Sequence, residues 1–195
     1  MSKDTVTIRL HRPEINELLF FFISGAIVSV PLTLFIEQYA SPLLTGLSSF
    51  DVAVITIVVF APFVEEFSKV FPLFYRHGET ERSIFNLGLF VGLGFGIVEF
   101  FTYVVTYGVQ IIPNRIPGLF FHPASTSITA YGIAKKRPVP FYLAAVALHF
   151  ANNFLTILNV PITVVVLAIT LLASWRLYGR TEEKFVNYPN VCESG

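Results

Sequence analysis

Six apolar stretches of about 20 residues limit what this 195-residue chain can fold into. A helix of that length crosses the roughly 30 Å hydrocarbon core of a bilayer. The expected membrane spans are Glu17–Ile36, Val52–Tyr75, Ile84–Gln110, Gly118–Ala134, Pro140–Leu158 and Val160–Leu177. We therefore predict an all-α membrane protein, a polytopic bundle of about six transmembrane helices.

Short polar or Pro/Gly-marked segments separate these spans. We expect the breaks at residues 39–49, 76–83, 111–117, 135–138 and 159–161. The last break leaves an alternative open, because Pro161 could instead kink one long, continuous helix.

Composition excludes several other classes of protein. Hydrophobic residues make up 54% of the chain and charged residues 13%, about half the share typical of soluble domains. A soluble core of this length could not bury so many large apolar side chains. Thirteen basic and thirteen acidic residues cancel, so no net charge points to nucleic acid. The single Cys192 excludes an internal disulfide and a cysteine-based metal site.

Eleven of the thirteen basic residues fall on one side of the expected bundle. They are Lys3, Arg9, Arg12, Arg76, Arg82, Lys135, Lys136, Arg137, Arg176, Arg180 and Lys184. Only Arg115 lies on the other side, and Lys69 lies within a span. Cytoplasmic loops carry the excess of Lys and Arg, so both termini are predicted to be cytoplasmic.

We expect a multi-pass integral membrane protein, located in the plasma (cell) membrane. We interpret residues 1–195 as a single transmembrane domain with its motif-bearing core at residues 52–158. Residues 179–195 are expected to form a polar cytoplasmic tail.

Polar residues within the spans indicate a buried site. Eight of them lie deep in the apolar stretches: Glu65, Glu66, Lys69, Glu99, His122, His149, Asn152 and Asn153. An ionisable group at the bilayer centre costs roughly 2.5–3.5 kcal/mol, so such residues mark functional sites or pairs. Counted from the cytoplasmic edges, Glu65, Glu99, His122 and His149 lie at similar levels, roughly 15–24 Å deep, on four different helices. Interhelical hydrogen bonding alone is the structural alternative.

Residue spacing suggests how these groups act. Glu65 and Glu66 lie four and three residues before Lys69, so either carboxylate can reach the ammonium group. The other glutamate would remain free as a general base, and the spacing does not decide which one it is. His149 and Asn153 share a helix face and could both donate to one oxyanion. Asn152 points about 100° away from Asn153, and we expect it to be a packing or hydrogen-bonding residue.

Several protease signatures are absent from the spans. There is no His-Glu-x-x-His pair, no aspartate and no Gly-x-Ser-Gly nucleophile motif. The remaining glutamates, histidines and asparagine can activate water and stabilise an oxyanion. These groups are sufficient for a peptide hydrolase.

Four motifs occur in order on four successive spans. They are Glu65-Glu66-x-x-Lys69, Phe95-x-x-x-Glu99, His122-x-x-x-Thr126 and His149-x-x-x-Asn153. This set resembles the PrsW-type glutamic intramembrane proteases, relatives of the CAAX prenyl endopeptidase and bacteriocin-processing (CPBP, ABI) superfamily. Glu99 stands where the wider superfamily has histidine, which favours the PrsW branch.

The resemblance implies a role for each motif residue. Glu65 would activate water with help from Glu99, and Glu66 would pair with Lys69. His149 and Asn153 would stabilise the oxyanion. The remaining pair would complete the pocket: His122 and Thr126. The substrate would be a membrane protein or membrane peptide, such as a single-pass anti-sigma factor.

Two other functions use the same residues. One is a proton- or ion-coupled transporter that relays charge through the carboxylates and Lys69. The other is a CAAX-type endopeptidase. We expect no cofactor and no metal, because Lys69 would repel a cation and no two of the site histidines share a span.

Overall fold

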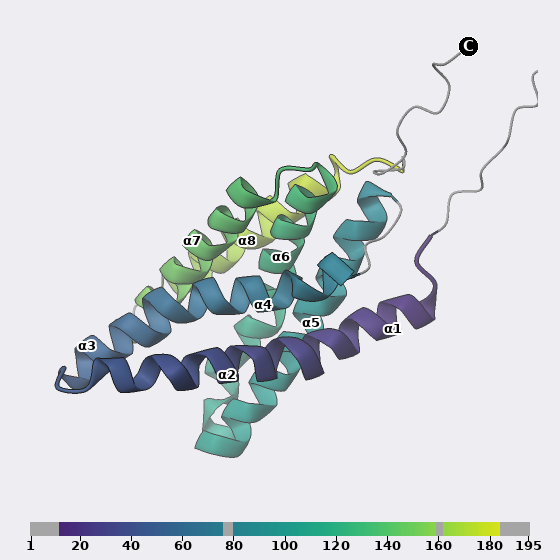
Figure 1. Cartoon of the computed structure of the whole chain (residues 1–195). Helices are drawn as coiled ribbons and strands as arrows, with labels where there is room; N and C mark the ends of the chain where they lie inside the picture. The colour runs from purple at the N-terminus through teal and green to yellow at the C-terminus, as the bar shows by residue number, and fades with distance from the viewer. Residues whose placement is uncertain (1–11, 76–79, 159–161, 184–195) are drawn as a thin grey trace, which may run out of the picture.

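The computed structural model describes residues 12–75, 80–158 and 162–183, and the regular secondary structure of these residues is helical, without strands (Figure 1). The described chain forms six successive helical stretches, as the apolar pattern predicts. The elements are α1 (Ile15–Ser24), η1 (Gly25–Ser29), α2 (Val30–Ala40), η2 (Ser41–Leu44), α3 (Ser49–Ala53), η3 (Val54–Phe60), α4 (Ala61–Tyr75), α5 (Glu81–Tyr107), η4 (Val109–Ile111), α6 (Ile112–Ala134), α7 (Pro138–Ile157) and α8 (Thr163–Tyr178). The all-α fold class is therefore confirmed.

One predicted break lies in the wrong place. Residues 112–117 belong to α6, and the chain turns earlier, at Gly108 and η4. Gly108 ends α5 with a φ of 83°, a backbone conformation that glycine adopts without strain. Pro113 lies in the first turn of α6, where a missing N–H costs no helical hydrogen bond.

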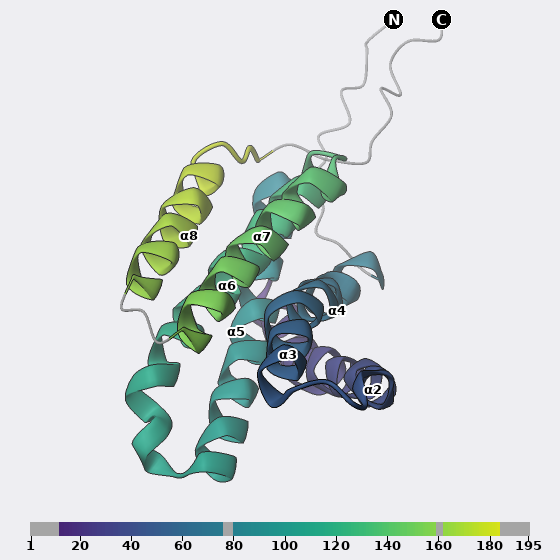
Figure 2. The same cartoon turned by 90° about the vertical axis from the view of Figure 1, so that its left-hand side faces the viewer.

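The last two helices are separate. The break expected at residues 159–161 lies outside the described residues, but α7 ends at Ile157 and α8 begins at Thr163. The two helices lie side by side (Figure 2). This arrangement rules out the kinked continuous helix.

Two of the helical stretches contain π-helical segments. η1 joins α1 to α2, and η3 joins α3 to α4. A π-segment adds one residue to a turn and so changes which side chains face a neighbouring helix. η1 directs Ser29, and η3 directs the backbone of Ile57, toward partners on other helices.

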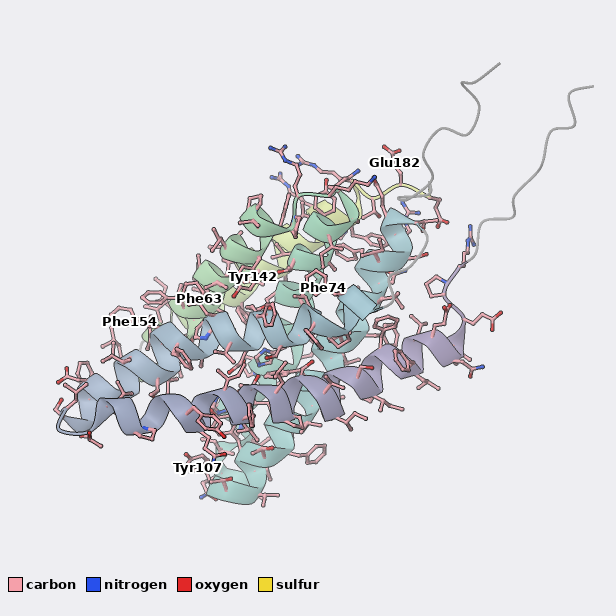
Figure 3. The ribbon with its side chains drawn as sticks, in the orientation of Figure 1. Phe63, Phe74, Tyr107, Tyr142, Phe154 and Glu182 are labelled. Carbon is pink, nitrogen blue, oxygen red and sulfur yellow. The ribbon has the colours of Figure 1, made fainter. Side chains whose placement is uncertain are left out.

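α5 lies at the centre of the bundle and packs against α1, α4 and α6. Glycine permits close contact at the crossing with α1. A Cβ atom on Gly25 would meet the carbonyl of Val91, and one on Gly94 would meet the carbonyl of Phe22. The far end of the α5–α6 hairpin, near Tyr107, extends beyond the other helices (Figures 1 and 3).

Three helices of the described chain are long and apolar enough to cross a membrane: Ile15–Ile36, Glu81–Tyr107 and Pro138–Ile157. α8 is a shorter apolar helix. The stretch Ser49–Tyr75 is long enough but carries four charged side chains: Asp51, Glu65, Glu66 and Lys69. Large apolar side chains are exposed along most helices, as expected where lipid covers the surface.

The first residues after α8 pack against the start of α5. Arg82 donates from its guanidinium to the carbonyl of Thr181 at 2.9 Å, and Thr181 is buried. This part of the expected polar tail is therefore bound to the bundle. Residues 184–195 of that tail lie outside the described residues.

Candidate active site

Six ionisable side chains from four helices meet inside the bundle. α4 provides three of them, and α5, α6 and α7 provide one each. We call this group the polar cluster: Glu65, Glu66, Lys69, Glu99, His122 and His149. Five of the six side chains are buried, and the Glu99 side chain is 23% exposed. The structure therefore brings together residues that are up to 84 positions apart in sequence.

Glu66 is the most engaged member of the cluster. Its Oε1 atom accepts hydrogen bonds from Lys69 Nζ at 2.6 Å, from His149 Nδ1 at 2.9 Å and from Ser125 Oγ at 3.0 Å. These donors come from α4, α7 and α6, so Glu66 joins three helices. The Glu66 and Lys69 side chains are both fully buried, and such a pair needs additional hydrogen bonds to offset its desolvation.

Lys69 continues the hydrogen-bonded chain to α6. Its Nζ lies 3.1 Å from His122 Nδ1 and 4.9 Å from the centre of the Phe95 ring. An ammonium group has donors only, so His122 Nδ1 accepts this bond. The His122 proton is then on Nε2, which donates to Glu99 Oε2 at 2.6 Å.

His149 lies between the two glutamates of α4. Its Nδ1 donates to Glu66, and its Nε2 lies 3.7 Å from Glu65 Oε2. The contact with Glu66 fixes the orientation of the ring and leaves Nε2 directed toward Glu65. The Phe121 ring packs edge-on against this imidazole, with centroids 5.2 Å apart.

The structure distinguishes Glu65 from Glu66. Adjacent helical residues point about 100° apart, so only one of them can face α6 and α7 squarely. Glu66 holds that position and is 0% exposed, whereas Glu65 lies at the margin and is 8% exposed. Glu65 is therefore the more accessible of the two carboxylates that contact His149.

Asn153 forms a contact that the sequence did not suggest. Its Nδ2 donates to the carbonyl of Ile57 in η3 at 2.9 Å. In a π-helix each carbonyl accepts from the N–H five residues later, as Thr56 does from Ala61. The residue five positions after Ile57 is Pro62, which has no N–H to donate. One Asn153 N–H therefore replaces a missing backbone donor, and the amide has one further N–H.

Two other predicted residues have local roles. Asn152 Nδ2 donates to Asn153 Oδ1 at 3.3 Å, so Asn152 hydrogen-bonds the neighbouring asparagine. The Thr126 hydroxyl donates to the His122 carbonyl at 2.8 Å, within its own helix. Thr126 also contacts the region of Gly92, where α5 and α6 pack closely.

Sequence reasoning did not identify Ser125 or Tyr142. Ser125 is fully buried and binds Glu66, and its position three residues after His122 was the available signal. Tyr142 donates from its hydroxyl to the Phe63 carbonyl at 2.8 Å, across the seam between α7 and α4 (Figure 3). No spacing rule within one helix could indicate that contact.

The model of one protein family matches most of the chain. Residues 13–176 match the PrsW family, described as intramembrane metalloproteases. The chain belongs to the PrsW family. Searches of curated proteins and of solved structures found no match. Membership of the PrsW family, together with the three apolar helices, makes this chain an integral membrane protein and a protease that acts on membrane-protein substrates.

The description of the PrsW family implies a metal ion, and part of the polar cluster fits one. Glu65, His122 and His149 can each offer one ligand atom, and these atoms lie within 4.8 Å of one another. His149 suits the role, because Glu66 holds its Nδ1 and metal-binding histidines commonly have such carboxylate support.

His122 does not fit the same role. Its Nδ1 accepts from Lys69 and its Nε2 donates to Glu99, so neither nitrogen keeps a free lone pair. Lys69 also places a positive charge 3.1 Å from that imidazole. The donor set thus falls short of the three protein ligands usual for catalytic zinc.

Proposed function

We propose that this chain hydrolyses peptide bonds of membrane proteins with water activated by Glu65. The observation that carries the proposal is that the two adjacent glutamates of α4 have different contacts. Glu66 is occupied by Lys69, Ser125 and His149, whereas Glu65 contacts the outward nitrogen of His149 at the margin of the polar cluster. A carboxylate in that position can accept a proton from water.

The proposed reaction has two proton transfers. Glu65 removes a proton from water while the oxygen attacks the carbonyl carbon of the scissile peptide. In this reaction His149 carries a proton on both ring nitrogens from the start, so the resulting oxyanion accepts hydrogen bonds from the His149 Nε2–H and from the second N–H of Asn153. Glu65 then passes its proton to the leaving nitrogen, and the peptide bond breaks.

Glu66 stabilises the positive charge of the protonated His149 ring. A proton on His149 Nε2 makes the ring an imidazolium, because Nδ1 already donates to Glu66. The anionic Glu66 stabilises that positive charge, and Lys69 balances Glu66 when the ring is neutral. Glu99 and His122 hold Lys69 from the other side.

The resemblance supports a proposal for the substrate, and the charge pattern supports one for the orientation in the membrane. We propose a single-pass membrane protein, such as an anti-sigma factor, as the substrate. The site lies among helices with lipid-facing apolar surfaces, which suits a substrate that is itself in the bilayer. We also propose the plasma membrane as the location, with both chain termini in the cytoplasm.

The experiment compares purified wild type with Glu65→Gln in detergent micelles. The probe is a panel of quenched fluorescent peptides, each with one apolar transmembrane segment. We expect the wild type to cleave members of the panel and Glu65→Gln to cleave none, because an amide accepts no proton at neutral pH. Glu183→Gln serves as the control, since Glu183 pairs with Arg82 at the bundle edge.

Undiminished turnover in Glu65→Gln would exclude Glu65 as the base. A wild type that moves ions across vesicle membranes and cleaves no peptide would favour the transporter instead.

A further inference from the structure

Pro72 removes a backbone donor from the helix that carries both glutamates and Lys69. In an α-helix each N–H donates to the carbonyl four residues earlier, and proline has no N–H. Pro72 lies inside α4, so the carbonyl of Ser68 lacks its helical donor. Ser68 is fully buried, and a buried carbonyl without a hydrogen-bond donor is destabilising.

Ser29 supplies the missing hydrogen bond from a different helix. Its hydroxyl donates to the Ser68 carbonyl at 2.8 Å, and Ser29 is itself 0% exposed. Ser29 is the last residue of η1, directly beyond the glycine-mediated crossing of α1 and α5. The first helical stretch, which has no motif of its own, is thus bonded to α4.

The bonded carbonyl lies within the turn that forms half of the polar cluster. Ser68 directly precedes Lys69 and follows Glu66 by two positions. We infer that Ser29 is a positioning residue, which holds this turn of α4 so that Glu65 and Glu66 meet His149. This inference rests on the proposed function of those glutamates.

A second bond of the same kind supports this interpretation. Asn153 donates to the Ile57 carbonyl, which has no backbone donor in the π-helical register because the residue five positions later is Pro62. Ser29 and Asn153 approach this stretch from two different helices. Prolines at both ends of the glutamate-bearing segment are therefore compensated by side chains of neighbouring helices.

Removing the Ser29 hydroxyl should displace this turn of α4 and leave the affinity for substrate unchanged. The Ser68 carbonyl would have to find another partner, and α4 can provide one only by a local rearrangement. Such a change would lengthen contacts that join Glu66 to other helices at 2.9–3.0 Å. We expect Ser29→Ala to lower kcat about tenfold and to leave KM within about twofold.

The test is a double-mutant cycle with Pro72→Ala. Alanine at position 72 restores an N–H to the Ser68 carbonyl, so Pro72→Ala should recover most of the kcat lost in Ser29→Ala. Ser24→Ala is the matched control. Ser24 lies on the same helical stretch and is buried, but its hydroxyl donates to Phe20 of its own helix.

The cycle uses the full chain, the peptide panel in detergent, and thermal unfolding of each variant. If Ser29→Ala alone does not fold, recovery of a folded, active enzyme in the double variant is the same test. The inference is overturned if Ser29→Ala behaves like Ser24→Ala, if Pro72→Ala gives no recovery, or if only the unfolding temperature falls while kcat stays unchanged.

A wild type that cleaves no peptide would reject the proposed function rather than the hydrogen bond. The coupling between Ser29→Ala and Pro72→Ala in unfolding temperature would then still decide whether Ser29 supports the Ser68 carbonyl.

Discussion

Two lysine–glutamate pairs of equal length lie in different parts of the bundle. Glu66 and Lys69 approach to 2.6 Å within the polar cluster, and Glu81 and Lys135 approach to 2.6 Å where α5 begins and α6 ends. The first pair is 0% exposed on both sides. In the second pair, Glu81 is 6% and Lys135 26% exposed.

The partners around each pair differ more than the pairs themselves. Glu81 also accepts the backbone N–H of Glu182 at 3.0 Å, near the end of the bundle where Figure 3 labels Glu182. These contacts bind the start of α5 to the end of α6 and to the residues after α8. Glu66 is instead bonded to an imidazole that can gain or lose a proton. The partners around Glu66, and not the ion pair itself, therefore distinguish the proposed site from the Glu81–Lys135 pair.

The largest expected difference between the two pairs is in turnover. Glu66→Gln removes the negative charge that holds Lys69 and supports His149, so we expect kcat to fall by roughly 10²–10⁴. Glu81→Gln should leave kcat within about twofold. Steady-state kinetics on the peptide panel gives both values, and equal losses in the two variants would contradict the comparison.

A smaller loss is expected on the α7 side of the polar cluster. His149→Ala and Asn153→Ala should each lower kcat on the order of 10²–10³, as removal of an oxyanion donor does. Asn153→Ala should also lower the unfolding temperature, because the Ile57 carbonyl loses its donor. Unchanged kcat in Asn153→Ala would exclude Asn153 as an oxyanion donor and leave it only the structural contact with Ile57.

Much of this arrangement could be predicted from the sequence. Hydropathy and breaks located the six helical stretches, because lipid exposure requires long apolar runs. Counting residues from the breaks placed Glu65, Glu99, His122 and His149 at similar depths on four helices. The rise of an α-helix is fixed, so depth can be read from sequence position.

The lateral arrangement of side chains could not be read in the same way. Glu65 and Glu66 are equally able to reach Lys69 along one helix, and only the packing of α6 and α7 favours Glu66. The contacts of Ser29 and Asn153 depend on π-helical segments and on carbonyls left open by proline. Both features are set by tertiary structure, which spacing within one helix does not describe.

Loss of the lysine should destabilise the protein more in the Glu66–Lys69 pair than in the Glu81–Lys135 pair. Lys69→Ala leaves Glu66 as a buried charge without its cation, which costs about 3–5 kcal/mol. Lys135→Ala removes a partly exposed partner, and we expect a loss of about 1 kcal/mol or less. Folded yield and thermal unfolding in detergent measure both. Equal stability of the two variants would show that Lys69 is not needed to neutralise the polar cluster.

The smallest expected effect is that of metal removal. Lys69 and Glu99 each hydrogen-bond one nitrogen of His122. The positive charge of Lys69 would also repel a metal cation bound beside this imidazole. We therefore expect activity to survive a strong chelator, and metal analysis of the pure protein to give well under one ion per chain. A zinc-dependent protease assayed in the same micelles is the control for chelation. Inactivation reversed by added zinc would instead mean that Lys69 and Glu99 release His122 when the ion binds, and His149 Nε2 would then be a ligand rather than an oxyanion donor.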